Sequence, residues 1–114
     1  MQLTNIKAGQ EWSEERFTKR MLFTNGDSSC AFVLNFQPGQ ELPAHRHPGS
    51  DVYLLALQGN GTCEVDGQSQ PFAQGDVLYC NGEEKLRLAN DGDEPFSVYV
   101  VLSQVPDPAY AKNV

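Results

Sequence analysis

Apolar and polar residues alternate along most of this chain in short runs that end at turn signals. Dipeptides such as Asn25-Gly26, Pro48-Gly49 and Asp66-Gly67 recur at close intervals. The runs between them are about five to nine residues long and rich in Val, Leu, Phe, Tyr and Thr, as in antiparallel sandwiches and barrels. No helix of ordinary length competes with this pattern. It predicts strands at Arg16–Thr24, Ser29–Gln37, Leu42–His47, Val52–Gln58, Thr62–Val65, Gln68–Ala73, Val77–Cys80, Lys85–Ala89 and Pro95–Leu102.

Two of the turns predict tight hairpins. Asn25-Gly26 and Asp66-Gly67 both tolerate the positive φ angles that a two-residue primed turn requires. Within the strands, side chains two residues apart share a face. The inner face is therefore predicted to carry Cys30, Phe32, Leu34 and Phe36 from one strand, and Leu86 and Leu88 from another.

Two strands break the alternation because both of their faces are apolar. Residues 52–57 and 96–102 have few polar side chains on either face. A strand of this kind is covered on both sides, either by two layers of one chain or by a partner subunit. The pattern therefore favours a homodimer.

The length of 114 residues allows one domain with one core. We expect the core at about 16–102, with extensions at 1–15 and 103–114. The first residues have no basic segment followed by an apolar run, and no stretch of about 18 apolar residues occurs. The sequence therefore predicts a soluble, cytoplasmic protein with no membrane partner.

The net charge argues against a nucleic-acid partner, and the cysteine spacing argues against disulfides and a zinc site. The formal net charge is −7 and no basic cluster occurs, so no nucleic-acid partner is expected. The three cysteines, Cys30, Cys63 and Cys80, are far apart and lack CxxC spacing. We expect them to be reduced, buried packing residues rather than disulfides or zinc ligands.

Both histidines of the chain, His45 and His47, lie one residue apart in the segment PGQELPAHRHPGS. On a strand, residues i and i+2 point the same way, about 6 to 7 Å apart, so both imidazoles are predicted to face one side and Arg46 the other. That geometry suits chelation of a metal ion. It suits equally two hydrogen-bonded histidines on one strand face, and the spacing alone leaves both interpretations open.

The wider context resembles the cupin family. Gly39, His45 and His47, followed by a Pro-Gly turn and a strand that ends at Gly59, resemble the first cupin signature. The stretch PFAQGDVLYCNGEEKLRLANDGDEP resembles the second, through Gly75-Asp76-Val77, Asn90, Gly92 and Pro95. The resemblance implies an all-β, cupin-type double-stranded β-helix, which is a jelly-roll barrel of antiparallel sheets and is often dimeric. It also implies one divalent metal ion (iron, manganese, nickel or zinc), held by two histidines and a glutamate from the first signature and a third histidine from the second.

Two positions depart from that implied ligand set. Val52 stands where the glutamate is expected, and Leu86 stands where the third histidine is expected. Alternation with Lys85 and Arg87 independently predicts that Leu86 points inward, and leucine has no lone pair to donate. Two ligands hold most divalent ions poorly, because each ligand adds several of the roughly 10 or more kcal/mol that secure a structural zinc ion.

A carboxylate beside Val52 offers an alternative donor. The shorter spacing permitted after His47 reaches Asp51, and a one-residue bulge after Pro48-Gly49-Ser50 would turn Asp51 inward. His45, His47 and Asp51 would then form a metal site of two histidines and one carboxylate. The sequence leaves open whether Asp51 or Val52 faces the interior.

The favoured function is that of a divergent small cupin that binds a small molecule inside its barrel, with at most a weak or incomplete metal site at the histidine pair. Val52 and Leu86 place apolar side chains where metal chemistry needs charged or polar donors. The predicted ligand pocket consists of Val52, Leu54, Tyr79, Leu86 and Leu88.

Two other functions stay open. One is a metal-dependent enzyme of the oxygenase or isomerase type that uses His45, His47 and Asp51. The other is a non-catalytic, dimeric interaction or structural protein. The sequence contains no nucleophile with a neighbouring base and no phosphate-binding loop, so catalytic residues stay unassigned and the question of enzyme activity stays open.

Overall fold

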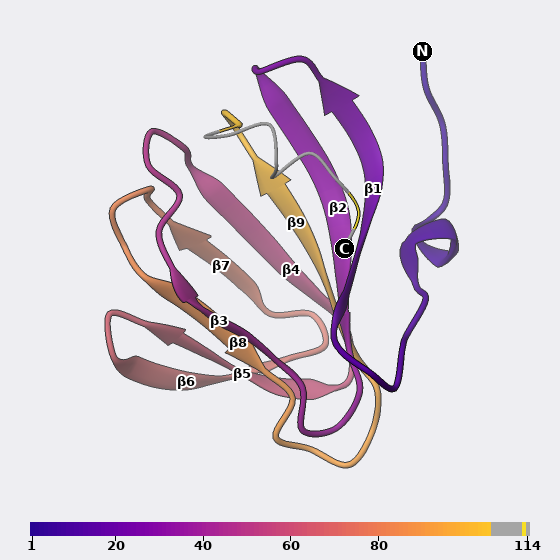
Figure 1. Ribbon diagram of the computed structural model, residues 1–114, viewed down its shortest axis with the longest axis vertical. Helices are drawn as coiled ribbons and strands as arrows, with labels where there is room; N and C mark the ends of the chain where they lie inside the picture. Colours follow the sequence, from indigo (N-terminus) through magenta and orange to yellow (C-terminus); the bar gives the residue numbers. More distant parts are fainter. Residues whose placement is uncertain (106–112, 114) are drawn as a thin grey trace.

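Two antiparallel sheets face one another and enclose one core (Figure 1). The computed structural model describes residues 1–105 and 113. The elements are the 3-10 helix η1 (Ile6–Gly9) and the strands β1 (Thr18–Asn25), β2 (Ser29–Phe36), β3 (Glu41–His45), β4 (Val52–Gln58), β5 (Asn60–Val65), β6 (Gln68–Ala73), β7 (Val77–Cys80), β8 (Leu86–Ala89) and β9 (Phe96–Leu102). The five-stranded sheet has the order β1-β2-β9-β4-β7, and the four-stranded sheet has the order β3-β8-β5-β6. The prediction of an all-β barrel with antiparallel sheets is confirmed.

Each predicted strand occurs, and the differences lie at strand ends. The largest are two residues each: β1 begins at Thr18 rather than Arg16, β3 ends at His45 rather than His47, and β5 begins at Asn60 rather than Thr62. β3 stops early because the chain turns there: Ser50 N donates to His47 O at 2.9 Å. Within the described part of the chain, no helix is long and apolar enough to cross a bilayer.

The two predicted hairpins differ in their turns. Asp66 and Gly67 have φ angles of 49° and 83° and join paired strands directly, which confirms the predicted two-residue turn. Asn25, by contrast, is still paired with Ser29, so the loop between them is longer than two residues. The predicted two-residue turn at Asn25-Gly26 is therefore wrong, although a hairpin forms there and Gly26 supplies the positive φ of 53°.

The core lies between the sheets and follows the predicted alternation. The inner-face residues predicted from β2 and β8 are at most 4% exposed. All three cysteines are free and buried, which confirms their packing role. The buried cluster contains Cys30, Phe32, Leu34, Phe36, Val52, Leu54, Ala56, Cys63, Phe72, Cys80, Leu86, Leu88, Phe96, Val98, Val100 and Leu102.

The segment before β1 packs on the outer side of the five-stranded sheet. Gly9 lies so close to β2 that a Cβ there would be 2.7 Å from a methyl carbon of Val33. Asn35 Nδ2 donates to Gly9 O at 2.7 Å, and Trp12 Nε1 donates to Phe96 O at 3.2 Å. This segment therefore covers one part of the outer face. Most of the extension predicted at 103–114 lies outside the described residues.

Candidate functional site

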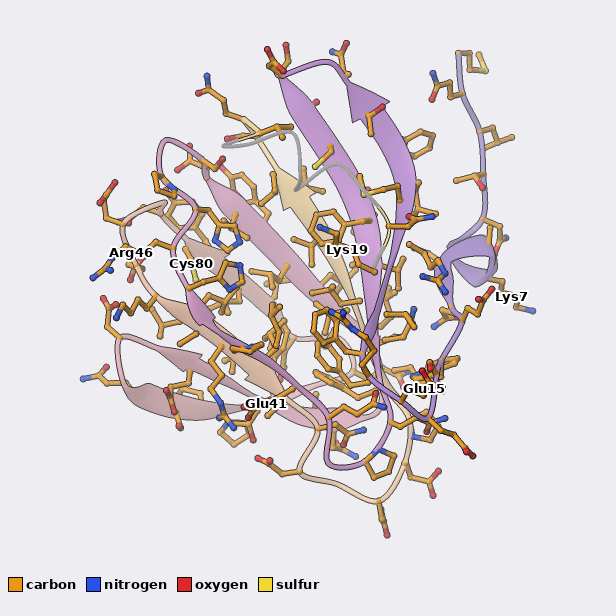
Figure 2. All side chains as sticks on the ribbon, viewed as in Figure 1. Lys7, Glu15, Lys19, Glu41, Arg46 and Cys80 are labelled. Carbon is orange, nitrogen blue, oxygen red and sulfur yellow. The ribbon has the colours of Figure 1, made fainter. Side chains whose placement is uncertain are left out.

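A cavity of about 190 Å³ lies between the two sheets, and we call it the barrel cavity. Its nitrogen-bearing lining side chains are Lys19, His45 and His47. Figure 2 shows Lys19 pointing into the space between the sheets, whereas Arg46 points away from it. The remaining lining is apolar and consists of Phe17, Phe32, Leu34, Leu42, Val52, Leu54, Leu86 and Val100.

The end of β3 brings the two histidines together. The pairing of β3 with β8 shifts between Leu42 and His45, and this places His45 opposite Leu86. The imidazole centroids of His45 and His47 are 4.4 Å apart, with an interplanar angle of 55°. His45 Nδ1 lies 2.9 Å from Pro43 O. Because a carbonyl oxygen only accepts, Nδ1 is the donor in this contact, which leaves Nε2 directed to other partners.

His47 is held in place by its backbone and is buried. Its N–H donates to Gly82 O at 3.0 Å, and the residue is 5% exposed. Burial lowers the pKa of His47 to about 4, and the neighbouring His45 and Lys19 act in the same direction. His47 is therefore neutral at pH 7, so it brings one N–H donor and one lone pair to the cavity.

The low pKa of His47 predicts a specific loss of stability in acid. Unfolding returns the pKa toward 6.5, so the unfolded chain takes up the proton first. The contribution is fully present above about pH 6.5 and is lost as the pH falls through about 4. We expect this group to remove about 3 kcal/mol of the free energy of unfolding across that window. Denaturation series at several pH values measure the slope, and an equally steep slope in His47→Gln would contradict the assignment.

The structure brings together two of the three predicted metal ligands. Val52 is fully buried and lines the barrel cavity. The neighbouring Asp51 lies just before the paired part of β4 and is not among the residues that line the cavity. Instead, Asp51 Oδ1 accepts a hydrogen bond of 2.6 Å from the hydroxyl of Tyr79, a side chain that is 52% exposed. That hydrogen bond raises the pKa of Tyr79 to about 12.

The donor set does not fit a tightly held metal ion. Leu86, which is 2% exposed, presents methyl groups to the cavity opposite His45. Among residues 1–105 and 113, no group of three or more His, Cys, Asp or Glu side chains is placed to hold a metal ion. The lining of the cavity therefore offers a divalent transition metal two ligand nitrogens, one from His45 and one from His47.

The sequence pattern and the fold together carry a family assignment. The profile of the cupin domain family matches residues 32–102, which is more than half of the chain. This chain belongs to the cupin family. The crystal structure of TT1209 from Thermus thermophilus superposes on the cupin with a TM-score of 0.87 and 23% identity, over 93% of this chain and 100% of that one. The predicted cupin-type double-stranded β-helix is thus confirmed.

Two curated relatives match parts of this cupin. Tetracenomycin polyketide synthase protein TcmJ from Streptomyces glaucescens is 27% identical over 70 residues, which are 61% of this chain and 47% of the relative. Gentisate 1,2-dioxygenase from Ralstonia sp. is 28% identical over 102 residues, which are 79% of this chain and 28% of the relative. The cupin therefore spans about half of one relative and less than a third of the other.

The predicted ligand-pocket residues lie in three places in the structure. Val52, Leu54 and Leu86 line the barrel cavity. Leu88 is fully buried in the core and lies outside the cavity lining. Tyr79 lies on the opposite side of the five-stranded sheet, where its ring is 5.2 Å from that of Tyr53. The cavity therefore contains the part of the predicted pocket that surrounds the histidines.

Lys19 is a site residue that the sequence pattern did not reveal. It lies opposite Leu34 in the pairing of β1 with β2, so its side chain points inward, and it is 9% exposed. Its Nζ is 5.1 Å from the ring centroid of Phe32, within the range of a cation–π contact. Burial lowers the pKa of Lys19, and the neighbouring Cys30 acts in the opposite direction. The sequence held one signal for an inward Lys19: the residues two positions to either side, Phe17 and Met21, are apolar, and residues two apart on a strand share a face.

The polar residues of the second signature have structural partners. Asp76 Oδ2 accepts from Ala73 N at 2.9 Å, which closes the turn before β7. Asn90 Nδ2 donates to Phe36 O at 2.9 Å and so ties β2 to the end of β8. Glu84 Oε1 accepts from Asn81 N at 2.9 Å. These contacts explain the residues as turn and loop anchors.

Proposed function

We propose that this cupin binds a small, mainly apolar molecule in the barrel cavity, with the polar end of that molecule directed toward Lys19 and the histidine pair. The observation that supports it is the composition of the cavity, which has apolar walls from both sheets and three nitrogen-bearing side chains. Small-molecule sites combine a mostly apolar lining with a few convergent polar groups in the same way.

The size of the cavity limits the ligand. An apolar cavity of about 150 Å³ is large enough for benzene, and the barrel cavity measures about 190 Å³. A molecule with one ring, or an aliphatic chain of similar bulk, therefore fits. Larger metabolites would need the cavity to widen.

The polar groups favour a ligand with an acceptor oxygen. A protonated lysine has only donors, and neutral His47 has one donor. Because Lys19 is 9% exposed, a carboxylate or phenolate close to it would interact in a medium of lower dielectric than water. A ring compound with a carboxylate or a similar oxygen function combines both requirements.

A metal-dependent enzyme of the oxygenase or isomerase type is the second candidate, and one relative is named as a dioxygenase. The side-by-side imidazoles of His45 and His47 favour it. Asp51 is bonded to Tyr79, however, and Leu86 faces the pair, so we propose at most weak binding of a divalent ion there.

Calorimetric and thermal-shift titrations with benzoate, benzamide and acetate test the proposal. We expect benzoate to stabilise the protein by RT ln(1 + [L]/Kd), benzamide to bind more weakly because it lacks the charge, and acetate to have no effect because it lacks the ring. Leu42→Trp, which fills the cavity from a half-buried position, should abolish the benzoate shift. Retention of the full shift in Leu42→Trp would show that benzoate binds elsewhere.

Lys19→Met tests the polar end, with Lys7→Met as its control. Lys7 lies on η1 and is exposed, so its substitution removes the same charge outside the cavity. Lys19→Met should weaken benzoate binding by about tenfold or more, while Lys7→Met should leave it unchanged. Equal benzoate affinity in the two variants would show that Lys19 does not contact benzoate. Failure of every ring compound to bind the wild-type protein would contradict the proposed function.

A further inference from the structure

Lys19 places a primary amine inside the barrel cavity. Its side chain points into the space between the sheets, and the residue is 9% exposed (Figure 2). Among residues 1–105 the other lysines are Lys7 and Lys85, and both are exposed. Lys19 is therefore the amine of this part of the chain that a molecule in the cavity would meet.

The surroundings of Lys19 make its amine more nucleophilic. The side chain lies among Phe17, Phe32 and Leu34, and Nζ is 5.1 Å from the ring centroid of Phe32. Burial there lowers the pKa of Lys19, against the weaker opposite effect of Cys30. At a given pH, a larger fraction of Lys19 is therefore the neutral amine than for a lysine of ordinary pKa. Only the neutral amine has a lone pair that attacks a carbonyl carbon.

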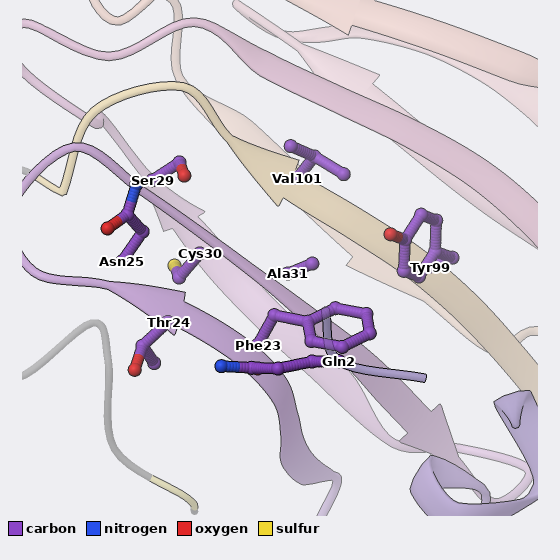
Figure 3. A pocket seen from close by; sticks show the side chains of 9 residues that line it. All are labelled: Gln2, Phe23, Thr24, Asn25, Ser29, Cys30, Ala31, Tyr99 and Val101. Atoms are coloured by element: carbon purple, nitrogen blue, oxygen red, sulfur yellow. The ribbon is translucent and has the colours of Figure 1, made fainter. Parts of the chain in front are cut away.

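A larger groove on the outer side of the five-stranded sheet lacks such a group. It measures about 440 Å³, and Figure 3 shows its lining of Gln2 and side chains from β1, β2 and β9. No lysine or histidine is among the described residues that line it. The barrel cavity, by contrast, combines Lys19 with His45 and His47. Carbonyl chemistry is therefore favoured in the smaller of the two hollows.

We propose that Lys19 forms a Schiff base with an aldehyde or ketone bound in the barrel cavity. The lone pair of Nζ attacks the carbonyl carbon and a C–N bond forms. The carbonyl oxygen then takes both protons of the amine and leaves as water, so a C=N bond replaces the C=O bond. His45 and His47 line the same cavity, and their ring nitrogens can carry these protons from nitrogen to oxygen.

The size and lining of the cavity define the class of carbonyl compound. A volume of about 190 Å³ accepts one ring, or an aliphatic chain of similar bulk. An aromatic aldehyde or a methyl ketone of one ring therefore fits. The inference rests on the proposed function, because the carbonyl compound must first bind in the cavity. A carboxylate there pairs with the protonated amine, whereas an aldehyde consumes the neutral amine.

Reductive trapping with benzaldehyde and sodium cyanoborohydride tests the proposal on the wild-type protein. The reagent reduces the imine to a stable benzylamine, which mass spectrometry of proteolytic peptides locates. We expect Lys19 to be benzylated at least about tenfold faster than Lys7 or Lys85, because binding holds the aldehyde next to Nζ. An excess of benzoate should suppress the labelling of Lys19 and leave that of Lys7 unchanged.

Three variants sharpen the test. Lys19→Arg keeps the positive charge but has no primary amine, so the fast labelling should disappear. Leu42→Trp fills the cavity and should slow the labelling of Lys19 to the rate of Lys7. Lys7→Met is the matched control, since Lys7 is exposed on η1, and it should keep the fast labelling of Lys19.

The outcomes separate this proposal from the proposed function. Labelling of Lys19 at the rate of the exposed lysines would overturn the Schiff base, and so would labelling that benzoate does not suppress. A protein that binds benzoate in the thermal-shift titration but gives no fast labelling at Lys19 would refute the Schiff base and leave the proposed function standing. Failure of both benzoate binding and fast labelling would contradict both.

Discussion

Replacing Leu86 with histidine is expected to raise the affinity of the barrel cavity for Zn²⁺ by about a hundredfold or more, because each added ligand contributes several kcal/mol to zinc binding. Leu86 is 2% exposed, lines the cavity and lies opposite His45 in the pairing of β3 with β8. A third imidazole at this position would join the two that are already 4.4 Å apart. Titration calorimetry of the untagged protein with ZnCl₂ measures the change.

Leu88→His is the matched control for this substitution. Leu88 lies on the same strand and is fully buried, but it is outside the cavity lining. Both substitutions bury an imidazole in place of leucine and should lower the melting temperature. Only Leu86→His should then be stabilised by zinc. Equal zinc affinity in the two variants would show that position 86 is no better placed than position 88 to complete a site with His45 and His47.

Replacing Gly59 with alanine is expected to lower the free energy of unfolding by about 3 kcal/mol or more. Gly59 has a φ of 84°, and a Cβ there would lie 2.3 Å from Pro95 O. The glycine between β4 and β5 therefore lets the backbone preceding β9 approach closely. Chemical denaturation monitored by Trp12 fluorescence measures the loss.

Gly67→Ala separates backbone strain from steric clash. Gly67 has nearly the same φ, 83°, but no atom lies within 4 Å of a Cβ placed there. We expect it to cost about 1 kcal/mol, from the left-handed conformation alone. The difference between the two variants measures the close contact at Pro95. Equal losses would show that this contact relaxes at no cost.

The period-two pattern predicted the barrel because burial and strand geometry act together along most of the chain. Cys30, Phe32, Leu34 and Phe36 alternate in the sequence and all lie in the core. The Asp66-Gly67 turn was predictable because a two-residue primed turn requires positive φ at both positions, and Asp and Gly tolerate it. The Asn25 turn was less predictable, since the registration of β1 with β2, and not the dipeptide alone, decides how many residues the loop contains.

The candidate site could be predicted only in part, because several of its features depend on register. Lys19 alternates with the apolar Phe17 and Met21, but a lysine in that pattern does not by itself predict an inward side chain, whereas its pairing opposite Leu34 does. The choice between Asp51 and Val52 depended on the path of the chain after Ser50, which buries Val52 and leaves the Asp51 carboxylate bonded to the Tyr79 hydroxyl. Neither the inward side chain of Lys19 nor the outward side chain of Asp51 follows from the identity of a single residue.

The barrel cavity and an outer groove lined by Tyr53, Val77 and Tyr79 lie on opposite sides of the five-stranded sheet. Val52 and Leu54 of β4 face the cavity, while Tyr53 of the same strand faces outward. This arrangement explains one of the two apolar faces of these strands, because that face forms the core and the cavity wall.

The cupin barrel offers an incomplete set of metal donors, and we propose that it holds a small molecule instead. Metal analysis of untagged protein, purified from cells supplied with manganese, iron, nickel and zinc, tests this most directly when it is repeated on His45→Ala. We expect far less than one equivalent of any of these metals in both proteins. A full equivalent that is retained by the wild-type protein through purification and lost in His45→Ala would contradict it.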